Sequence, residues 1–451
     1  MTDLLKNRQN SSKKLAALID GEHYPGINLD AINKLKKTFK GTFAGIIFLG
    51  GTEKLMSSNL ESFYGHKVIK IGKLEKDFIP ALKTLCPDYV FDLSDEPVVN
   101  YMARAKIASY CLACRCTYMG PDFCFEHEAP LHSFTKSSLL IIGTGKRIGK
   151  TGVSSYIAGL ISKKRKVCIL AMGRGGPPRP TLLKGSNIKI TPQFLLDISR
   201  KGMHASSDYI EDALFSKVDT VGCRRCGGGF GGKFFLSNIS QGVKLCEKTN
   251  PDLIIVEGSG ASVPPVKTDR CICLIGADQE WESIAGYLGI YRILISDMVI
   301  LTMCEEPIAT AQKISVLEQE IRSANHVIKI VKTVFRPEPL YPVEGKRVFM
   351  LLTAKSGAGD NIKKYLEKEY NCKVTGISFN LANRDKLKEE LQNFNDYDVL
   401  LSELKAASVD MVTEFAASNG KDINYMNNIP VIIEGAGLFN DFIKDLETSA
   451  K

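Results

Sequence analysis

A nine-residue run, GTGKRIGKT at 143–151, has the composition of a loop that binds phosphate. The apolar stretch SLLII at 138–142 precedes it, and a helical pattern over 152–161 follows it. A glycine-rich connection from a strand to a helix presents successive backbone N–H groups to phosphate oxygens at the positive end of the helix. The alternative is a tight turn that binds nothing. The spacing favours the first interpretation, so we predict that this loop binds a nucleoside triphosphate.

The side chains of this loop have separate predicted roles. Lys150 would reach the β- and γ-phosphates, and the hydroxyl of Thr151 would bind Mg²⁺. Lys146 and Arg147 would neutralise the group being transferred, which makes Lys146, Arg147 and Lys150 the predicted catalytic residues. Thr144 departs from the pattern G-x-x-x-x-G-K-[ST], because it occupies the first glycine position. The residues predicted to hold the nucleotide are Gly143, Thr144, Gly145, Gly149, Lys150 and Thr151.

An acidic residue follows a second apolar stretch. LIIV at 253–256 is followed by Glu257 and then by GSG at 258–260. A carboxylate that leaves a buried strand into glycines can reach a magnesium ion without steric obstruction. The alternative is a glutamate facing solvent, which would suit a polar flank better than this apolar one. We therefore predict that Glu257 and Thr151 both belong to the magnesium shell.

Arginines among glycines predict a second anionic ligand. Arg174 lies in GRGGPPR at 173–179, and Arg224 and Arg225 lie in VGCRRCGGG at 221–229. Both segments are predicted turns at the carboxyl ends of strands, where α/β sheets bind ligands. The arginine fork of donors matches phosphate geometry. A surface turn is an equal alternative for each segment alone, but the two together favour binding of a polyanionic substrate.

Polar residues near the N-terminus follow two further predicted strands. IDGEHYP at 19–25 places Glu22 and His23 after the first strand, and DLSDEP at 92–97 follows the fourth. Carboxylates and histidines at strand ends can hold a substrate or transfer protons. Turn and N-cap chemistry is the alternative, and for 94–95 it is the better one. For Glu22 and His23 we favour substrate binding.

Cysteine spacing leaves a metal site open. Cys223 and Cys226 form a C-x-x-C pair, and a second group contains Cys111, Cys114, Cys116 and Cys124, with His127 and His132 close by in the sequence. Such spacings are compatible with zinc or an iron–sulfur cluster. No second well-spaced C-x-x-C accompanies either group, so buried reduced thiols are the favoured interpretation. The 13 cysteines are an odd number and are scattered, which predicts a cytoplasmic protein.

Short apolar runs alternate with helical patterns along the whole chain, which predicts an α/β fold with largely parallel sheets. We predict an N-terminal Rossmann-like α/β domain (1–133), a P-loop NTPase domain with a mostly parallel sheet (134–340) and a C-terminal α/β segment (341–451). The sequence leaves open whether that last segment is separate or completes the P-loop domain. A proline-rich stretch, 336–346, follows the predicted strand 327–334.

Length, charge and apolar content limit the kinds of partner that we expect for this protein. The chain has 451 residues, enough for two or three domains, and a formal charge of +9. The arginines named above lie beside glycines and not in basic blocks, so we predict small polyanions and no nucleic acid. No apolar run is long enough to span a membrane, and the N-terminal MTDLLKNRQNSSKK lacks the apolar core of a secretion signal.

Seven motifs in order resemble the cyclic 2,3-diphosphoglycerate synthetase family. The phosphate loop and VEG at 256–258 are also similar to dethiobiotin synthetase. The motifs are IDGEHYP at 19–25, GTGKRIGKT at 143–151, AMGRGGP at 171–177, VGCRRCGGG at 221–229, VEGSGASVPPV at 256–266, GYLGIYR at 286–292 and LTMCEEP at 301–307.

The resemblance implies an ATP-dependent ligase that closes 2,3-diphosphoglycerate into a cyclic phosphoanhydride and releases ADP and phosphate. It also implies Mg²⁺ and K⁺ as cofactors, a methanogen-type product associated with thermal protection, and substrate phosphates held by Arg174, Arg224 and Arg225. A plausible route phosphorylates one substrate phosphate, after which the other displaces inorganic phosphate. We expect a homodimer.

Two other functions remain open from the sequence. The same site would suit a kinase that makes 2,3-diphosphoglycerate from 2-phosphoglycerate. A P-loop metallochaperone would instead load a metal through the cysteine pairs. Such proteins commonly use GTP and carry an [NT]-K-x-D motif, which this sequence lacks, so ATP is favoured.

Overall fold

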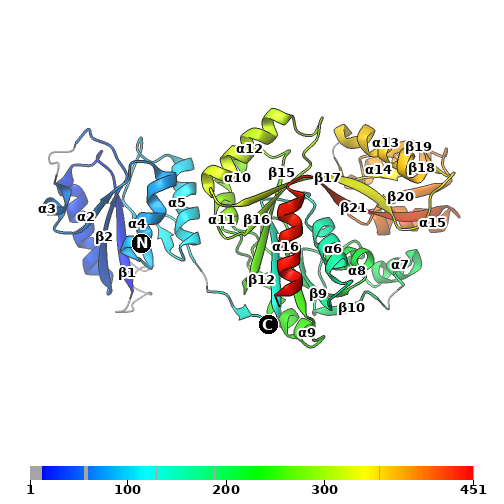
Figure 1. The fold of residues 1–451 in the computed structure, drawn as a ribbon, viewed down its shortest axis with the longest axis horizontal. Coiled ribbons are helices and arrows are strands. Elements are labelled where there is room, and N and C mark those ends of the chain that lie inside the picture. The colour runs from blue at the N-terminus through cyan, green and yellow to red at the C-terminus, as the bar shows by residue number, and fades with distance from the viewer. Residues whose placement is uncertain (1–12, 55–58, 128, 187–188, 355, 450–451) are drawn as a thin grey trace. The chain divides into compact units, whose positions relative to one another are not determined.

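The computed structural model shows two compact units of α/β structure (Figure 1), which confirms the predicted fold class. The residues it describes are 13–54, 59–127, 129–186, 189–354 and 356–449. The smaller unit contains residues 1–129, 280–295 and 320–326, and the larger one contains 130–279, 296–319 and 327–451. Most of the N-terminal segment 1–14, which is predicted above not to be a secretion signal, lies outside the described residues. Within the described residues, no helix is both long and apolar enough to cross a membrane.

The smaller unit is a doubly wound sheet with strand order β3-β2-β1-β4-β5-β6, in which only the pairing of β5 with β6 is antiparallel. This is the predicted Rossmann-like arrangement, whose strand order reverses between β1 and β4. Its elements are β1 (Lys14–Ile19), α2 (Pro25–Thr38), β2 (Thr42–Phe48), α3 (Leu60–Tyr64), β3 (Val68–Lys70), α4 (Leu74–Leu85), β4 (Tyr89–Asp92), α5 (Tyr101–Ala113), β5 (Thr117–Met119), β6 (Cys124–Phe125), α10 (Trp281–Gly286) and α11 (Gly289–Leu294).

Alternation along β1 explains why helices cover both faces of this sheet. Leu15, Ala17 and Ile19 are fully buried on the face covered by α2 and α3. Ala16 and Leu18 are equally buried on the opposite face, against α4, α5 and the α10–α11 segment. A strand whose successive residues are all apolar is typical of a parallel sheet buried on both sides.

The larger unit has one long sheet with the order β10-β11-β9-β13-β8-β15-β16-β17-β21-β20-β18-β19. We call its part from β10 to β17 the P-loop half-sheet. The elements of that half are β7 (His132–Ser133), β8 (Ser137–Gly143), α6 (Lys150–Ile161), β9 (Val167–Gly173), β10 (Thr181–Lys184), α7 (Pro192–Arg200), α8 (Asp208–Ser216), β11 (Asp219–Cys226), β12 (Leu236–Ser237), α9 (Ile239–Glu247), β13 (Leu253–Gly258), β14 (Val266–Lys267), β15 (Arg270–Gly276), β16 (Met298–Thr302), α12 (Ala311–Ala324, shared between the units) and β17 (Lys329–Pro339).

The remaining strands form what we call the C-terminal half-sheet, in which β19, β18, β20 and β21 are parallel. It continues the sheet across the predicted boundary at residue 340, although the three-domain division itself stays a prediction. Its elements are β18 (Arg347–Leu351), the 3₁₀ turn η1 (Ser356–Ala358), α13 (Gly359–Tyr370), β19 (Lys373–Ser378), α14 (Arg384–Asn393), β20 (Val399–Glu403), the π-helical turn η2 (Ser408–Thr413), α15 (Glu414–Ser418) and β21 (Asp422–Glu434); α16 (Ala436–Thr448) follows.

Two long strands, β17 and β21, join the half-sheets as an antiparallel ribbon (Figure 1). Only the first residues of β17, 329–332, pair with β16, and only the first residues of β21, 422–426, pair with β20. The remainder of each strand pairs with the other. The strands of the two halves therefore run in opposite directions, and the carboxyl ends of both half-sheets face each other.

The expectation that a proline-rich stretch ends the strand at Val334 is wrong. The strand continues through Pro337 to Pro339, paired with β21 on one side only. Proline lacks an N–H, so it is tolerated in a strand whose other edge has no partner, and β16 pairs with β17 only as far as Lys332.

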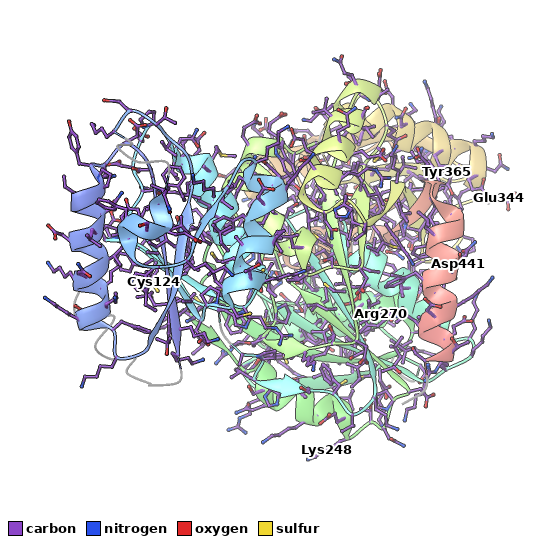
Figure 2. The ribbon with its side chains drawn as sticks, turned by 60° about the vertical axis from the view of Figure 1, so that its left-hand side comes forward. Cys124, Lys248, Arg270, Glu344, Tyr365 and Asp441 are labelled. Carbon is purple, nitrogen blue, oxygen red and sulfur yellow. The ribbon has the colours of Figure 1, made fainter. Side chains whose placement is uncertain are left out.

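The chain returns to the P-loop half-sheet in its last helix. Phe439, Phe442 and Leu446 of α16 are buried in the same core as α6, and the ring of Phe439 lies 6.3 Å from that of Tyr156. Asp441 lies on the exposed face of this helix (Figure 2). The C-terminal half-sheet is thus connected to the P-loop half by two chain crossings, one through β17 and one through β21.

Gly152 and Gly159 of α6 give a direct test of how closely the P-loop helix approaches the ribbon. A Cβ atom at Gly152 would lie 2.5 Å from the carbonyl oxygen of Asn428 in β21, whereas one at Gly159 would meet nothing within 4 Å. Gly→Ala inside a helix stabilises by up to about 1 kcal/mol, and overpacking costs about 1–3 kcal/mol.

We therefore expect Gly152→Ala to lower the free energy of unfolding and Gly159→Ala to raise it, as measured by urea denaturation. Equal stabilisation by both substitutions would show that β21 does not press on the first turn of α6.

Candidate active site

A cavity of about 290 Å³ lies where the carboxyl ends of the two half-sheets meet. The loops after β8, β9, β13 and β16 line one side of it, and the loops after β18 and β20 line the other. Wall residues from the P-loop half include Lys146, Arg147, Lys150, Thr151, Arg174, His204, Ser206, Ser207, Asp208, Glu257, Gly260, Met303, Glu305 and Ile308. The ribbon and the C-terminal half contribute Phe335, Thr353, Ala354, Ala358, Ile362, Glu403, Lys405 and Asn428.

The predicted phosphate loop occupies the floor of this cavity. Gly149, the N-cap residue directly before α6, has a φ of +86°, a left-handed conformation of the kind that a nest of N–H groups uses. Lys150 is buried and donates from Nζ to the Gly145 carbonyl at 2.6 Å. Burial lowers the pKa of Lys150, which Glu257 opposes. Thr302 holds the backbone just before Gly149, since its hydroxyl donates to the Ile148 carbonyl at 3.1 Å.

Thr144, the departure from the usual loop pattern, has a structural explanation. Its hydroxyl is 2.6 Å from Oε1 of Gln279, and its N–H donates to the Leu274 carbonyl at 3.1 Å. The side chain therefore anchors the loop to the end of β15. Gly143, Thr144 and Gly145 lie at the base of the loop and not on the cavity wall.

Thr151 and Glu257 come together as predicted for two residues of one metal shell. The Thr151 hydroxyl donates to Glu257 Oε1 at 2.9 Å, and both side chains are buried. The other oxygen of Glu257, Oε2, is buried without a hydrogen-bond partner among the described residues. Whether Mg²⁺ binds there stays a prediction.

Sequence reasoning missed a second carboxylate beside Glu257. Asp212 is 0% exposed, accepts a hydrogen bond from Ser155 through Oδ1, and has a buried Oδ2 that meets no donor among the described residues. Burial and the charge of Glu257 raise the pKa of Asp212, and burial and Asp208 raise that of Glu257. Two such oxygens can be stabilised by a shared proton or by a divalent cation, which prefers oxygen ligands.

Asp212 is one of three acidic residues on the same face of α8. Asp208, Glu211 and Asp212 are spaced i, i+3 and i+4, so they share one face of α8. Asp208 lines the cavity, and Glu211 and Asp212 are buried. In the sequence this spacing is typical of a solvated helix face, which is why it carried no functional signal.

The three predicted substrate arginines have different environments. Arg174 is exposed and lines the cavity. Arg225 is buried and donates to the carbonyls of Gly227 at 2.6 Å and Ser259 at 2.7 Å, so it holds the 258–260 loop at the cavity wall. Arg224 is exposed on the opposite face of β11. The expectation that 224 and 225 lie in a turn is wrong, because β11 pairs with β9 and β12 through these residues.

The two other cations of the phosphate loop, Lys146 and Arg147, are exposed on the cavity wall. Arg147 has a φ of 62°, a left-handed conformation that is costly for a residue with a Cβ. Burial and the neighbouring charges of Arg174 and Arg147 lower the pKa of Lys146. A polyanion bound here would relieve this repulsion.

The structure separates Cys223 from Cys226. They lie three residues apart on β11, so Cys223 is buried on one face and Cys226 is exposed on the other. Of the other group, Cys111 and Cys116 are buried, and Cys114 and Cys124 are partly exposed. Among the described residues, no three His, Cys, Asp or Glu side chains are grouped as a metal site would require.

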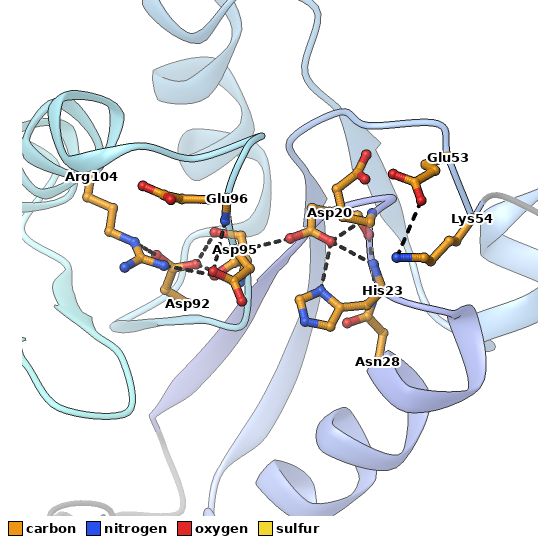
Figure 3. Close-up of polar contacts among 11 residues, drawn as sticks. Asp20, His23, Asn28, Glu53, Lys54, Asp92, Asp95, Glu96 and Arg104 are labelled. Carbon is orange, nitrogen blue, oxygen red and sulfur yellow. Dashed lines mark hydrogen bonds and ion pairs between the residues drawn. The ribbon is translucent and has the colours of Figure 1, made fainter.

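Glu22 and His23 belong to the smaller unit, at the carboxyl end of β1 (Figure 3). Asp20, 1% exposed, accepts hydrogen bonds from the N–H groups of Glu22, His23 and Asp95 and lies 2.8 Å from the His23 ring. Asp92, at the end of β4, accepts a hydrogen bond from the N–H of Ser94, and its Oδ2 lies 3.5 Å from Nε of Arg104. The substrate role of Glu22 and His23 stays a prediction.

Known proteins match the chain over nearly its whole length. The N-terminal, P-loop and C-terminal domains of cyclic 2,3-diphosphoglycerate synthetase match residues 14–126, 138–334 and 339–429. The synthetase of Methanothermus fervidus is 44% identical over 96% of both chains, and that of Methanothermobacter thermautotrophicus is 43% identical over 94% of both. The synthetase of Rubrobacter xylanophilus is 41% identical over 92% of this chain and 93% of its own.

The Asp212–Glu257 pair predicts a pH dependence of stability in magnesium-free protein. Because both folded-state pKa values are raised, the stabilisation present at low pH is lost as the pH rises through them. The amide of Asp212→Asn donates like a protonated acid and does not titrate. We expect its melting temperature relative to wild type to rise from about pH 5 to about pH 8 in EDTA.

Asp441→Asn, which alters an exposed carboxylate of α16, is the matched control and should give a difference that does not vary with pH. A pH-independent difference for Asp212→Asn as well would show that the two buried carboxylates do not share a proton.

Proposed function

The chain belongs to the cyclic 2,3-diphosphoglycerate synthetase family, and from this premise we propose that it uses ATP to join the two phosphates of 2,3-diphosphoglycerate as a cyclic phosphoanhydride, releasing ADP and phosphate. One observation carries the proposal. The cavity brings together the phosphate loop, the buried carboxylate of Glu257 and cations from loops at the carboxyl ends of both half-sheets. A nucleotide and a second polyanion can meet there.

The two ends of the cavity suit different parts of the ligands. One end of the cavity is apolar and lies on the side of β8 away from β13. Its residues are Met303 and Ile308 after β16, Phe335 in β17 and Ile362 in α13. We assign this end to the adenine. The exposed cations Lys146, Arg147 and Arg174 lie toward β9 and β13, where we place the γ-phosphate and the diphosphoglycerate.

The residues of this chain would act by positioning and charge. Bringing two phosphates together is opposed by Coulomb repulsion, which cations between them offset. Lys146, Lys150 and Arg174 would hold the transferring group, and Arg225 would fix the wall beside it by its bonds to backbone carbonyls.

In the proposed route, the γ-phosphoryl group passes from ATP to one substrate phosphate and ADP leaves. The other substrate phosphate then attacks the inner phosphorus of that new diphosphate, forms the P–O–P bond of the ring and expels inorganic phosphate. This route needs no nucleophile on the protein, because the substrate phosphates supply both attacking oxygens.

Thr151 and Glu257 would hold Mg²⁺, with Asp212 as a third oxygen donor, because their buried oxygens fit an oxygen-preferring cation. When bound, that ion neutralises phosphate charge. Potassium dependence, a homodimer and a cytoplasmic location follow only from the resemblance or the composition and remain predictions. No observation favours the kinase or the metallochaperone alternative.

Product analysis with a loop variant tests the function. Wild-type protein with ATP, Mg²⁺ and 2,3-diphosphoglycerate should form one cyclic anhydride and one phosphate per ADP, as seen by ³¹P NMR. Lys150→Ala should lose about 10²-fold or more of this activity, because it removes a preorganised cation from the transferring group. Lys163→Ala, an exposed lysine just beyond α6, is the control. ADP formation without an anhydride product would refute the proposal.

Arg225 and Arg224 form a second matched pair, because they are adjacent but face opposite sides of β11. We expect Arg225→Lys to impair turnover, since lysine cannot donate to the Gly227 and Ser259 carbonyls at once as the guanidinium does. Loss of one such contact costs about 1.5–3 kcal/mol. Arg224→Lys should cost much less. If the two substitutions had equal kinetic effects, Arg225 would have no special role in the active site.

A further inference from the structure

The end of β20 and the loop that follows it bring two charged residues, Glu403 and Lys405, to the cavity wall opposite the phosphate loop. Glu403 is fully engaged. One oxygen accepts from the N–H and the hydroxyl of Thr353 at 2.7 and 2.6 Å, and the other accepts from the Asn428 amide at 2.6 Å. Glu403 thereby links the end of β20 to the segment after β18 and to the middle of β21, which fixes the backbone near Lys405.

Among the described residues, Lys405 has one ion-pair partner, Glu211. Its Nζ lies 3.2 Å from Glu211 Oε1, a contact that uses one of its three donors. The Lys405 side chain is 30% exposed, against 6% for Glu211, so the lysine forms the open side of the pair. Burial alone would lower the pKa of Lys405, but the charges of Glu211 and Glu403 outweigh it and raise the pKa. The lysine is therefore charged at neutral pH.

The backbone beside Lys405 is in an unfavourable conformation. Ala406 has a φ of 49°, and left-handed conformations cost a residue with a Cβ about 1–2 kcal/mol. Two further residues with such angles, Arg147 and Met303, lie in loops that line the same cavity. Strain of this kind gathers at ligand sites, where the surrounding structure holds it in place.

Ring closure needs cations for two substrate phosphates besides those that hold the nucleotide. The proposed function assigns Lys150 to the nucleotide phosphates, and Arg225 bonds to two backbone carbonyls and is not one of the residues that line the cavity. Among the described wall residues, Arg174 on one half-sheet and Lys405 on the other are the arginine and lysine side chains that the nucleotide loop does not supply; His204 also lies on the wall. We propose that Lys405 binds a phosphate of the vicinal diphosphate substrate, so that the C-terminal half-sheet carries part of the substrate subsite. This inference rests on the proposed function.

A purely structural role would make Lys405 a bridge that holds the half-sheets together. Arg200 and Glu414 form a second such bridge, with 3.2 Å between Arg200 Nη2 and Glu414 Oε1, and neither residue lines the cavity. Arg200→Met is therefore the matched control for Lys405→Met. Arg200→Met removes the ion pair between α7 and the C-terminal half, and Lys405→Met removes the one between α8 and that half. Only Lys405 lines the cavity.

The experiment is steady-state kinetics of both variants against each substrate. We expect Lys405→Met to raise the KM for 2,3-diphosphoglycerate about 10- to 150-fold, which corresponds to one lost charge-assisted contact, with the KM for ATP little changed. Lys405→Arg should restore much of the loss, and Arg200→Met should leave both constants unchanged. Equal changes in both KM values, or the same behaviour of Lys405→Met and Arg200→Met, would overturn the proposal.

Calorimetric titration of 2,3-diphosphoglycerate without ATP separates this inference from the proposed function. If wild type makes the cyclic product but Lys405→Met binds diphosphoglycerate equally well, only the role of Lys405 fails. If wild type makes no cyclic product, the proposed function fails. Lys405→Gln, whose amide can still donate to Glu211, provides the same comparison if Lys405→Met does not fold.

Discussion

The antiparallel pairing of β17 with β21 determines how the larger unit is arranged. Because β21 runs against β17, its parallel partners β20 and β18 run against the P-loop strands as well. Loops that follow parallel strands are where α/β sheets bind ligands, and here two such sets of loops point at the same space. The contacts that close this space, from Gly152 against Asn428 to Lys405 with Glu211, depend on that one change of strand direction.

Buried charge is the second constraint on the site. Asp212 and Glu257 lie side by side without enough donors, while Lys150 nearby is itself desolvated. Leaving unpaired charge in a protein interior is costly, so this arrangement makes the ligand-free site the less favourable state. A bound phosphate would compensate the buried charge of Lys150, and a divalent cation would compensate the buried charge of Asp212 and Glu257.

The sequence predicted the local features of the site well and the remote ones poorly. Thr151 and Glu257 could be placed because each follows a buried strand at a recognisable spacing, and the structure brings them to 2.9 Å. Asp212 and Lys405 could not, since their roles arise only when α8 and the loop after β20 are brought to the phosphate loop. The expected turn at Arg224 and Arg225 was wrong because the neighbouring glycines suggested a turn, whereas these residues continue strand β11 and alternate between its two faces.

The path of the chain through the larger unit also bears on how the protein is made. The core beneath the phosphate loop is completed by α16, which is synthesised after the entire C-terminal half-sheet. During translation, the apolar positions beside Tyr156 therefore stay uncovered while β18 to β21 (residues 347–434) are synthesised. Domains usually fold as units when their last segment emerges, and long-range closures slow that step. The core beneath the phosphate loop is therefore completed only after the C-terminal half-sheet has been synthesised, because α16 follows that half-sheet in the chain.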